Sequence, residues 1–379
     1  MRRFIGVLIC ALACGLVVVS LQAIAEHPSW AYGFTTPPPP PGAAPAAPAA
    51  GGGGRGAGGA APAAGAPAAG GARAGGGGAA PAAAGGRQGA PPDTMIYTLP
   101  GSTLQLMRNQ IGNGFGPADW YPGDHPMMPS IVANGRMEGN VTACALCHMP
   151  NGKGRPENAS VSGLPVDYFI STMMDFRNDN RKSADSRKAN TNRMIAIAKA
   201  MTEDEIRQAA VYFGSMPWTQ WIRVVETATV PQTRIQGGMF LSLDNGMSEP
   251  IGNRIIEAPE NTERTEVYRD PRSSFVAYAP VGSIARGQAL VTTGGNGRTV
   301  ACGTCHGADL RGMGPIPGLA GRSPSYLVRQ MYDMQTGNRK GSWGELMKPV
   351  VANLTAEDLV AIAAYAASRP MPAGPAVAR

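Results

Sequence analysis

Two stretches of this sequence combine a polar start signal with apolar residues at helical spacing. Thr202 is followed three residues later by Glu205, and Thr355 by Asp358, which is the pattern of a capping box at the start of a helix. The second stretch continues with an apolar stripe formed by Leu359, Ile362, Ala363 and Ala366. The pattern therefore predicts two similar helices in two separate parts of the chain.

Between these helices, residues 216–281 carry shorter apolar runs that are typical of strands. The runs cover residues 221–225, 254–256 and 275–278 and are rich in β-branched and aromatic residues. A disordered linker would not carry Trp218 and Trp221. We therefore expect residues 216–281 to form a small β-containing insert that packs across both halves.

The N-terminal part shows no such periodicity. Residues 35–92 are almost wholly Pro, Ala and Gly and cannot bury a core, so residues 26–94 are expected to form a disordered linker. A flexible coil of this length has a mean span of about 40 Å, which suits a tether. Alternatively, the peptide that carries Trp30, Tyr32 and Phe34 docks on a partner. We favour an ordinary disordered tail.

Residues 1–25 have the pattern of a signal peptide. Arg2 and Arg3 precede an apolar run over residues 4–21, and Ala23-Ile24-Ala25 fits a small-residue cleavage site. The alternative is an uncleaved membrane anchor, because the apolar run is nearly long enough to span a bilayer. Both interpretations place the folded part in the periplasm, tethered to the membrane if the signal stays uncut.

The positive charge of the chain does not indicate a nucleic-acid partner. The formal net charge is +7, but five of the cations and two of the acids lie in residues 1–93, so residues 94–379 carry +4. No run rich in Lys or Arg accompanies this weak excess. Binding to nucleic acid is therefore not expected.

Four cysteines remain after the expected signal peptide, and all four belong to one kind of motif. They fall as Cys144-Ala-Leu-Cys147-His148 and Cys302-Gly-Thr-Cys305-His306. Export would permit disulfides, but C-x-x-C-H is the attachment signature of c-type haem. Zinc would need two more ligands near each pair, and a redox C-x-x-C does not need the histidine. We expect two covalently bound haem c groups, with His148 and His306 as iron ligands.

An internal repeat suggests the sixth ligand of each iron. The two halves align without a gap from Cys144 to Lys182 at a shift of 158 residues, and Tyr168 and Arg181 map to Tyr326 and Arg339. After a five-residue insertion the match resumes at a shift of 153, which places Met194 over Met347. We expect each methionine to lie on a loop before its helix and to ligate iron through its thioether.

Other side chains compete for these positions. The chain has 19 methionines, and most of the rivals lie in helix-like runs where core packing explains them better: Met173, Met174, Met201, Met313, Met331 and Met334. His125 is a weaker candidate for a sixth ligand or for an acid–base group. Its sequence, Gly-Asp-His-Pro, fits a surface or capping histidine.

With these motifs in place, the chain resembles the tandem diheme class I cytochromes c, of which cytochrome c4 is the best-known kind. The resemblance covers residues 130–215 and 282–370. It implies a mainly α fold with two cytochrome c-like haem domains and electron transfer in the periplasm. It also implies that Pro315 or Pro317 borders the proximal face of the second haem. The first half has no clean equivalent of this proline.

Composition, repeat and resemblance together divide the chain. We expect a signal peptide (1–25), a linker (26–94), a first haem domain with an N-terminal extension (95–215), the β-containing segment (216–281), a second haem domain (282–370) and a tail (371–379).

The sequence favours an electron carrier over an enzyme. With His and Met on both irons, no coordination position is left for a substrate. The alternatives are a diheme peroxidase or thiosulfate-oxidising enzyme, and a dedicated subunit of a larger respiratory or quinoprotein complex. Redox proteins are the expected partners. A docking rim for them is hypothesised from the cations that precede Met194, namely Arg177, Arg181, Lys182, Arg187, Lys188 and Arg193.

Overall fold

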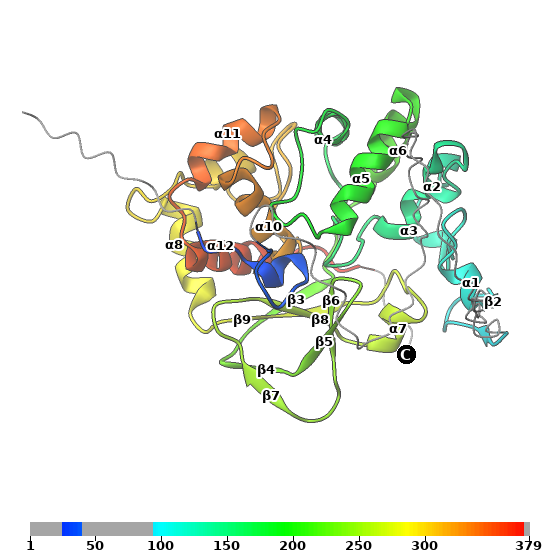
Figure 1. Ribbon diagram of the computed structural model, residues 1–379, viewed down its shortest axis with the longest axis horizontal. Coiled ribbons are helices and arrows are strands. Elements are labelled where there is room, and N and C mark those ends of the chain that lie inside the picture. Colours follow the sequence, from blue (N-terminus) through cyan, green and yellow to red (C-terminus); the bar gives the residue numbers. More distant parts are fainter. Residues whose placement is uncertain (1–24, 40–93, 375–379) are drawn as a thin grey trace, which may run out of the picture.

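A computed structural model describes residues 25–39 and 94–374 of the chain. Residues 1–24 of the expected signal peptide, most of the expected linker and residues 375–379 lie outside the described part. Two groups of helices lie side by side, and a set of small sheets packs beneath both of them in the view of Figure 1. The described chain is therefore mainly helical, with a β-containing insert, as the sequence predicts.

The first helical domain contains five helices. They are α2 (Ser130–Ala133), α3 (Cys144–His148), α4 (Val166–Arg177), α5 (Ala189–Ala200) and α6 (Glu203–Gly214). The capping box predicted for α6 is confirmed: the backbone N–H of Glu205 donates to Thr202 Oγ1 at 3.1 Å, and the Thr202 N–H donates to the Glu205 carboxylate at 2.7 Å. Helices α4, α5 and α6 bury their apolar faces against one another around Phe213 and Ile206.

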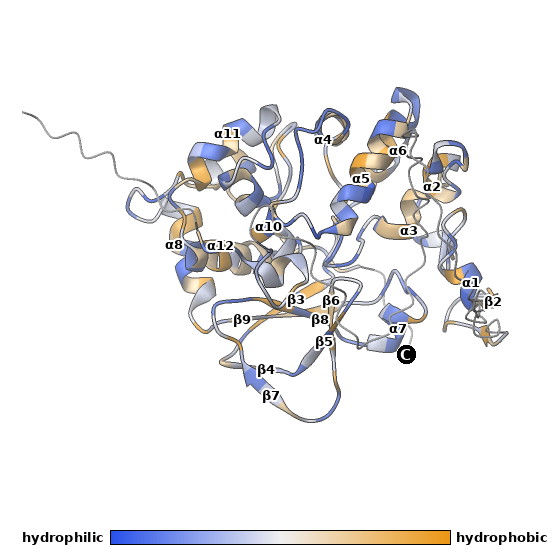
Figure 2. Ribbon diagram, in the orientation of Figure 1, coloured by the Kyte–Doolittle hydropathy of each residue, from blue (hydrophilic) through white to orange (hydrophobic). Residues whose placement is uncertain are grey.

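The second helical domain repeats this arrangement. Its helices are α8 (Ser283–Thr293), α9 (Gly303–His306), α10 (Pro324–Gln335), α11 (Ser342–Val351) and α12 (Ala356–Ser368). Helix α12 is buried over most of its length, and Figure 2 shows its apolar character. Helix α8 crosses it so closely that a Cβ on Gly287 would lie 2.0 Å from the carbonyl oxygen of Ala361. Only glycine permits this crossing.

The insert between the helical domains is a three-stranded mixed sheet with two small antiparallel pairs of strands. Strand β9 (Phe275–Ala279) pairs in parallel with β3 (Ile222–Glu226) and antiparallel with β8 (Ile256–Pro259). The antiparallel pairs are β4 (Thr229–Pro231) with β7 (Ser248–Pro250) and, between them in the chain, the hairpin of β5 (Thr233–Gln236) and β6 (Met239–Ser242); α7 (Thr262–Glu266) follows β8. The runs expected at 221–225 and 275–278 are strands, whereas the run at 254–256 reaches its strand only at Ile256.

The insert contacts both helical domains, as expected. Trp218 donates from its indole N–H to the carbonyl of Ala320 at 2.9 Å, and the guanidinium of Arg322 stacks on its ring at 4.2 Å from the centroid. On the other side, the Asn151 side chain donates to the carbonyl of Pro271 at 2.6 Å. These contacts fix the positions of the two helical domains relative to each other.

Residues 94–129 form an extension that attaches to the insert. It contains β1 (Ile96–Tyr97), β2 (Leu106–Met107), α1 (Arg108–Ile111) and the short 3-10 helix η2 (Pro122–Asp124). Buried Trp120 donates to the carbonyl of Tyr268 at 2.7 Å, and Arg272 pairs with Asp124 at 2.7 Å. The extension therefore has its own small core, held mainly by the insert.

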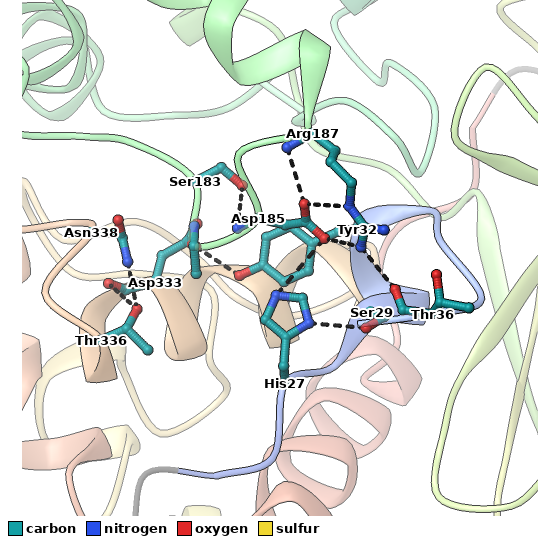
Figure 3. Close-up of polar contacts among 11 residues, drawn as sticks. His27, Ser29, Tyr32, Thr36, Ser183, Asp185, Arg187, Asp333, Thr336 and Asn338 are labelled. Atoms are coloured by element: carbon teal, nitrogen blue, oxygen red, sulfur yellow. Dashed lines mark hydrogen bonds and ion pairs between the residues drawn. The ribbon is translucent and has the colours of Figure 1, made fainter. Parts of the chain in front are cut away.

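Residues 25–39 form an ordered segment, which we call the strap. Its 3-10 helix η1 (Ser29–Tyr32) lies against α10, and the fully buried Tyr32 donates to Asp333 Oδ1 at 2.7 Å. At its far end the carbonyl of Thr36 accepts from Arg187 at 2.8 Å (Figure 3). The expectation of disorder from residue 26 is wrong for residues 26–39, because Ala31 and Tyr32 of the strap are buried in the core of the second domain.

In the described part of the chain, no single helix is long and apolar enough to cross a bilayer. Helices α11 and α12 pass this test only as a pair, and they are bent by 115° at the break between them. Both belong to the second helical domain.

Candidate haem sites

Both C-x-x-C-H motifs lie on a single short turn of helix. Helix α3 spans the whole first motif, and α9 spans the second from the residue after Cys302. Among the described residues no disulfide joins any two of the four cysteines, and no group of three or more His, Cys, Asp or Glu side chains could hold a metal ion.

The two motif histidines are held in the same way. The ring of His148 donates from Nδ1 to the carbonyl of Ala159 at 2.8 Å, and that of His306 donates to the carbonyl of Pro317 at 2.8 Å. Because a carbonyl only accepts, the proton lies on Nδ1 and leaves the Nε2 lone pair free to bind a metal. Burial lowers the pKa of both imidazoles, which favours this neutral form.

The two accepting carbonyls occupy equivalent places in the repeat. Ala159 and Pro317 each lie 11 residues beyond their histidine and differ by the same shift of 158 residues. Pro317 therefore lies beside the second histidine, as the resemblance implies, and Ala159 takes its place in the first half. Sequence reasoning missed Ala159 because a backbone carbonyl leaves no signature in the residue type.

The methionines proposed as sixth ligands lie on helices rather than on loops. Met194 is on α5 and Met347 is on α11, both half-buried. The expectation of loops is wrong because α5 and α11 each continue to within a few residues of the following helix. Met347 lines the same cavity as Cys302, Cys305 and His306. Met194 and Cys144 pack against the same apolar cluster in the first domain.

Several of the rival methionines have clear packing roles. Met173, Met201 and Met334 are buried in their domain cores, and Met313 is exposed. Met331 and Met334 on α10 line the same cavity as Met347. The cavity alone therefore does not single out Met347 as the iron ligand. His125 has both ring nitrogens engaged, Nε2 with Asp119 at 3.0 Å and Nδ1 with the carbonyl of Pro126 at 2.9 Å. Its ring therefore makes local contacts within the N-terminal extension.

The cavity of the second domain suits a haem in the chemistry of its lining. Apolar side chains form most of its wall, among them Ile316, Leu319, Leu327, Val350, Leu354 and Ile362. Arg322 and Arg339 contribute the cations that two propionate groups require, and the buried Nε of Arg339 has no hydrogen-bond partner among the described residues. A flat apolar macrocycle with carboxylates at one edge matches both features.

A symmetric network joins the two domains beside this cavity. Arg339 donates to the hydroxyl of Tyr168 at 2.6 Å, and Arg181 donates to that of Tyr326 at 3.1 Å. Both arginines also donate to the side chain of Gln330. Tyr168 belongs to the first domain yet lines the cavity of the second, so the two sites are neighbours.

The docking rim hypothesised before Met194 does not form. Arg181 and Lys188 are buried, and Arg177 donates to the carbonyls of Ala198 and Met201. Lys182 pairs with Asp179, and Arg187 pairs with Asp185. Most of these cations therefore neutralise or cap other parts of the chain rather than facing a partner. The two domains are joined instead by Arg181, Tyr168 and their repeat counterparts. The sequence did not indicate this role.

Comparisons with known proteins agree with this geometry. The cytochrome c family model matches residues 284–369. A 76-residue stretch is 40% identical to cytochrome c-554(548) of Halomonas halodenitrificans and covers 92% of that protein. The chain therefore belongs to the class I c-type cytochromes, which confirms the family expected from its motifs. Haem c, bound covalently, is the cofactor, and the chain has two attachment motifs.

Two other relatives are matched over less than half of their length. The chain is 39% identical to the thiosulfate dehydrogenase electron acceptor of Stutzerimonas stutzeri over 98 residues, which is 25% of this chain and 44% of that protein. It is 41% identical to cytochrome c4 of Pseudomonas aeruginosa over 81 residues, 21% of this chain and 39% of that protein. The chain thus spans less than half the length of these relatives.

Similar solved structures include two proteins of these kinds. A thiosulfate dehydrogenase from Marichromatium purpuratum has a TM-score of 0.41 at 24% identity and covers 62% of this chain and 38% of its own. Cytochrome c4 of Acidithiobacillus ferrooxidans has a TM-score of 0.39 at 20% identity. That alignment covers 59% of this chain and 97% of the cytochrome c4 chain.

Proposed function

We propose that this protein is a periplasmic diheme cytochrome that carries electrons between an exported or membrane-bound donor and an acceptor. His148 and Met194 ligate one iron, and His306 and Met347 ligate the other. When bound, each haem c supplies a reversible one-electron couple at its iron. The periplasmic location rests on the signal-like pattern of residues 1–25.

The matched anchoring of the two histidines is the observation that carries this proposal. In each half a backbone carbonyl fixes the imidazole by its Nδ1–H and presents Nε2 to the haem. A fixed imidazole keeps the ligand geometry the same in both oxidation states, which lowers the reorganisation that accompanies electron transfer. Two such sites in one chain suit a carrier.

Met194 and Met347 would fill the remaining coordination position of each iron and so close it to other ligands. The thioethers of Met194 and Met347 lie on helices packed against the domain cores, so they are restrained in position. Methionine binds iron in both oxidation states, and it raises the reduction potential relative to a second histidine. A substrate would have to displace this side chain before it reached the metal.

Contacts between the domains support electron exchange between the two sites. The Arg339–Tyr168 and Arg181–Tyr326 bonds, with the backbone bond from Lys182 N–H to the carbonyl of Asn338 at 2.7 Å, fix the domains together. Val300 and Leu346 line the second cavity and are also exposed at the surface. A redox partner reaches the second haem at this opening.

The relatives suggest the class of partner. One of them is named as the electron acceptor of thiosulfate dehydrogenase. By analogy, the donor of this chain is an exported oxidoreductase of small inorganic sulfur compounds, and the acceptor is another redox protein. No described residue is assigned a catalytic role.

Carbon monoxide binding tests the carrier proposal against an enzyme with an open iron. The reduced haem-loaded protein is expected to bind no CO at either haem, and to be oxidised and reduced by one electron per haem. The Met194→Ala and Met347→Ala variants, each with one open iron, serve as positive controls. Rapid CO binding by the unmodified protein, or turnover of peroxide or thiosulfate, would overturn the proposal.

A further inference from the structure

A cavity of about 440 Å³ lies away from the haem sites, where three segments meet. The strap forms one wall with residues 32–36. The loop that enters α5 forms the second wall with residues 187–190. The turn between β5 and β6 forms the third with Gly237 and Gly238. The cavity is partly open, and Thr35, Thr36 and Gly237 at its edge are exposed.

Two glycines seal the strap against the hairpin turn. Gly33 and Gly238 both have positive φ, +85° and +86°. A Cβ on Gly33 would lie 2.7 Å from the Cα of Gly238, so the two backbones touch. This wall of the cavity is therefore bare backbone and contributes no acidic side chain.

The second wall contributes a buried lysine without a partner. Lys188 is 3% exposed and lines the cavity, with its Nζ beside Gly238, 3.4 Å from where a Cβ on that residue would stand. The amine makes no hydrogen bond and no ion pair within 4.0 Å in the described part of the chain. Burial lowers its pKa to about 7, which reflects the cost of leaving this charge unpaired.

The carboxylates around Lys188 each bind another group and lie beyond ion-pair distance of its amine. Asp185 accepts from Arg187 at 2.6 Å, and Glu157 pairs with Arg155 through Oε1 at 2.7 Å, while the buried Oε2 of Glu157 has no hydrogen-bond partner in the described part of the chain. Asp333 accepts from Tyr32 and from the backbone N–H of Ala184 at 2.8 Å. Figure 3 shows Asp185 with its donor Arg187 and Asp333 with its donor Tyr32. The positive charge of the amine is therefore left for a ligand.

We propose that this cavity binds a small oxyanion of the phosphate or sulfate class, with Lys188 as its charged partner. A buried ammonium group is stabilised by a negative charge with several acceptor lone pairs, which a tetrahedral oxyanion supplies. The exposed hydroxyls of Thr35 and Thr36 at the edge are further donors. The cavity is large enough, because a water molecule takes about 30 Å³. The proposal does not depend on the electron-transfer role.

Calorimetry on the haem-loaded full chain tests the site, with inorganic phosphate and sulfate as probes against chloride at equal ionic strength. The unmodified protein is expected to bind one oxyanion. Lys188→Met, which keeps an unbranched side chain of similar size but removes its charge, should weaken binding at least tenfold. Lys199→Met, at an exposed lysine on α5, is the matched control and should bind as the unmodified protein does.

Hydrogen exchange provides a second measurement if Lys188→Met does not fold. Phosphate should slow exchange of the backbone amides in residues 32–36 and 187–190 at least threefold in the unmodified protein, and leave β4 and β7 unchanged. No binding of either oxyanion at millimolar concentration, or equal binding by Lys188→Met, would overturn the proposal.

Discussion

Arg339 of the second haem domain donates a hydrogen bond of 2.6 Å to the hydroxyl of Tyr168 in the first. Both residues are buried, and their repeat counterparts Arg181 and Tyr326 form the reciprocal bond. A buried guanidinium is costly unless most of its N–H groups find acceptors. The contact between the domains therefore depends on a small number of polar groups.

Tyr168→Phe should weaken this contact. The substitution keeps the ring but removes the hydroxyl that accepts from Arg339, and a buried donor left without a partner costs about 1–3 kcal/mol. We expect a loss of this size in the free energy of unfolding of the haem-loaded protein, measured with denaturant. Tyr326→Phe is the matched variant. A free energy of unfolding within about 0.5 kcal/mol of that of the unmodified protein, for both variants, would contradict this account.

The strap should loosen when the hydroxyl of Tyr32 is removed. Tyr32→Phe leaves Asp333 with only the N–H of Ala184 as a hydrogen-bond donor at Oδ1, at a cost of about 1–3 kcal/mol. Faster hydrogen exchange in residues 29–36 would measure the effect. Tyr332→Phe is the control, because Tyr332 packs against Tyr32 but its hydroxyl makes no hydrogen bond in the described part of the chain. Equal exchange in the two variants would show that the bond does not hold the strap.

Asp333 should make stability depend on pH. Burial raises its pKa in the folded protein to about 6, whereas an unfolded chain has a pKa of about 3.9 at aspartate. Between these values the folded state binds more protons, so its free energy of unfolding falls as pH rises from about 4 to 6. Asp333→Asn can still accept both hydrogen bonds and does not titrate.

Relative to the unmodified protein, Asp333→Asn should therefore gain stability across that window, by at most about 3 kcal/mol. Unfolding in denaturant at a series of pH values measures the gain. Asp309→Asn, at an exposed residue, should show no such trend. A stability difference that stays flat between pH 4 and 7 would contradict burial of a charged carboxylate at this position.

Gly287→Ala should destabilise the second domain. The added Cβ would lie 2.0 Å from the Ala361 carbonyl, so α8 and α12 must move apart, and overpacking of this kind costs about 1–3 kcal/mol. Thermal unfolding of the haem-loaded protein measures the loss. Gly123→Ala, where no atom lies within 4 Å of the new Cβ, is the control. A variant as stable as the control would mean that the helices do not cross at Gly287.

Features set by local sequence could be predicted, and features set by distant residues could not. The motif turns and the capping boxes of α6 and α12 depend on residues within three or four positions, and the structure has them where they were expected. The repeat predicted which positions are equivalent. It did not indicate that Tyr168 and Arg339 meet each other, because an internal alignment carries no information on how two copies pack.

The strap and the expected docking rim also show that local sequence patterns do not reveal distant partners. Order in residues 26–39 depends on Asp333, about 300 positions away, and no local pattern in the strap indicates this partner. Arg181 and Lys188 read as surface cations because charge is normally solvated. Both are buried by segments that fold over them from elsewhere in the chain. The loop predicted at Met194 is instead part of α5, which spans residues 189–200 without a break.

The ligation of each iron by histidine and methionine is the central claim, and the absorption spectrum of the oxidised protein tests it most directly. Methionine bound to ferric haem c gives a weak charge-transfer band at the red end of the spectrum. We predict this band in the unmodified protein, with about half its intensity in Met194→Ala and in Met347→Ala, since each variant loses one of two bonds. Absence of the band, or full intensity in either variant, would contradict the account.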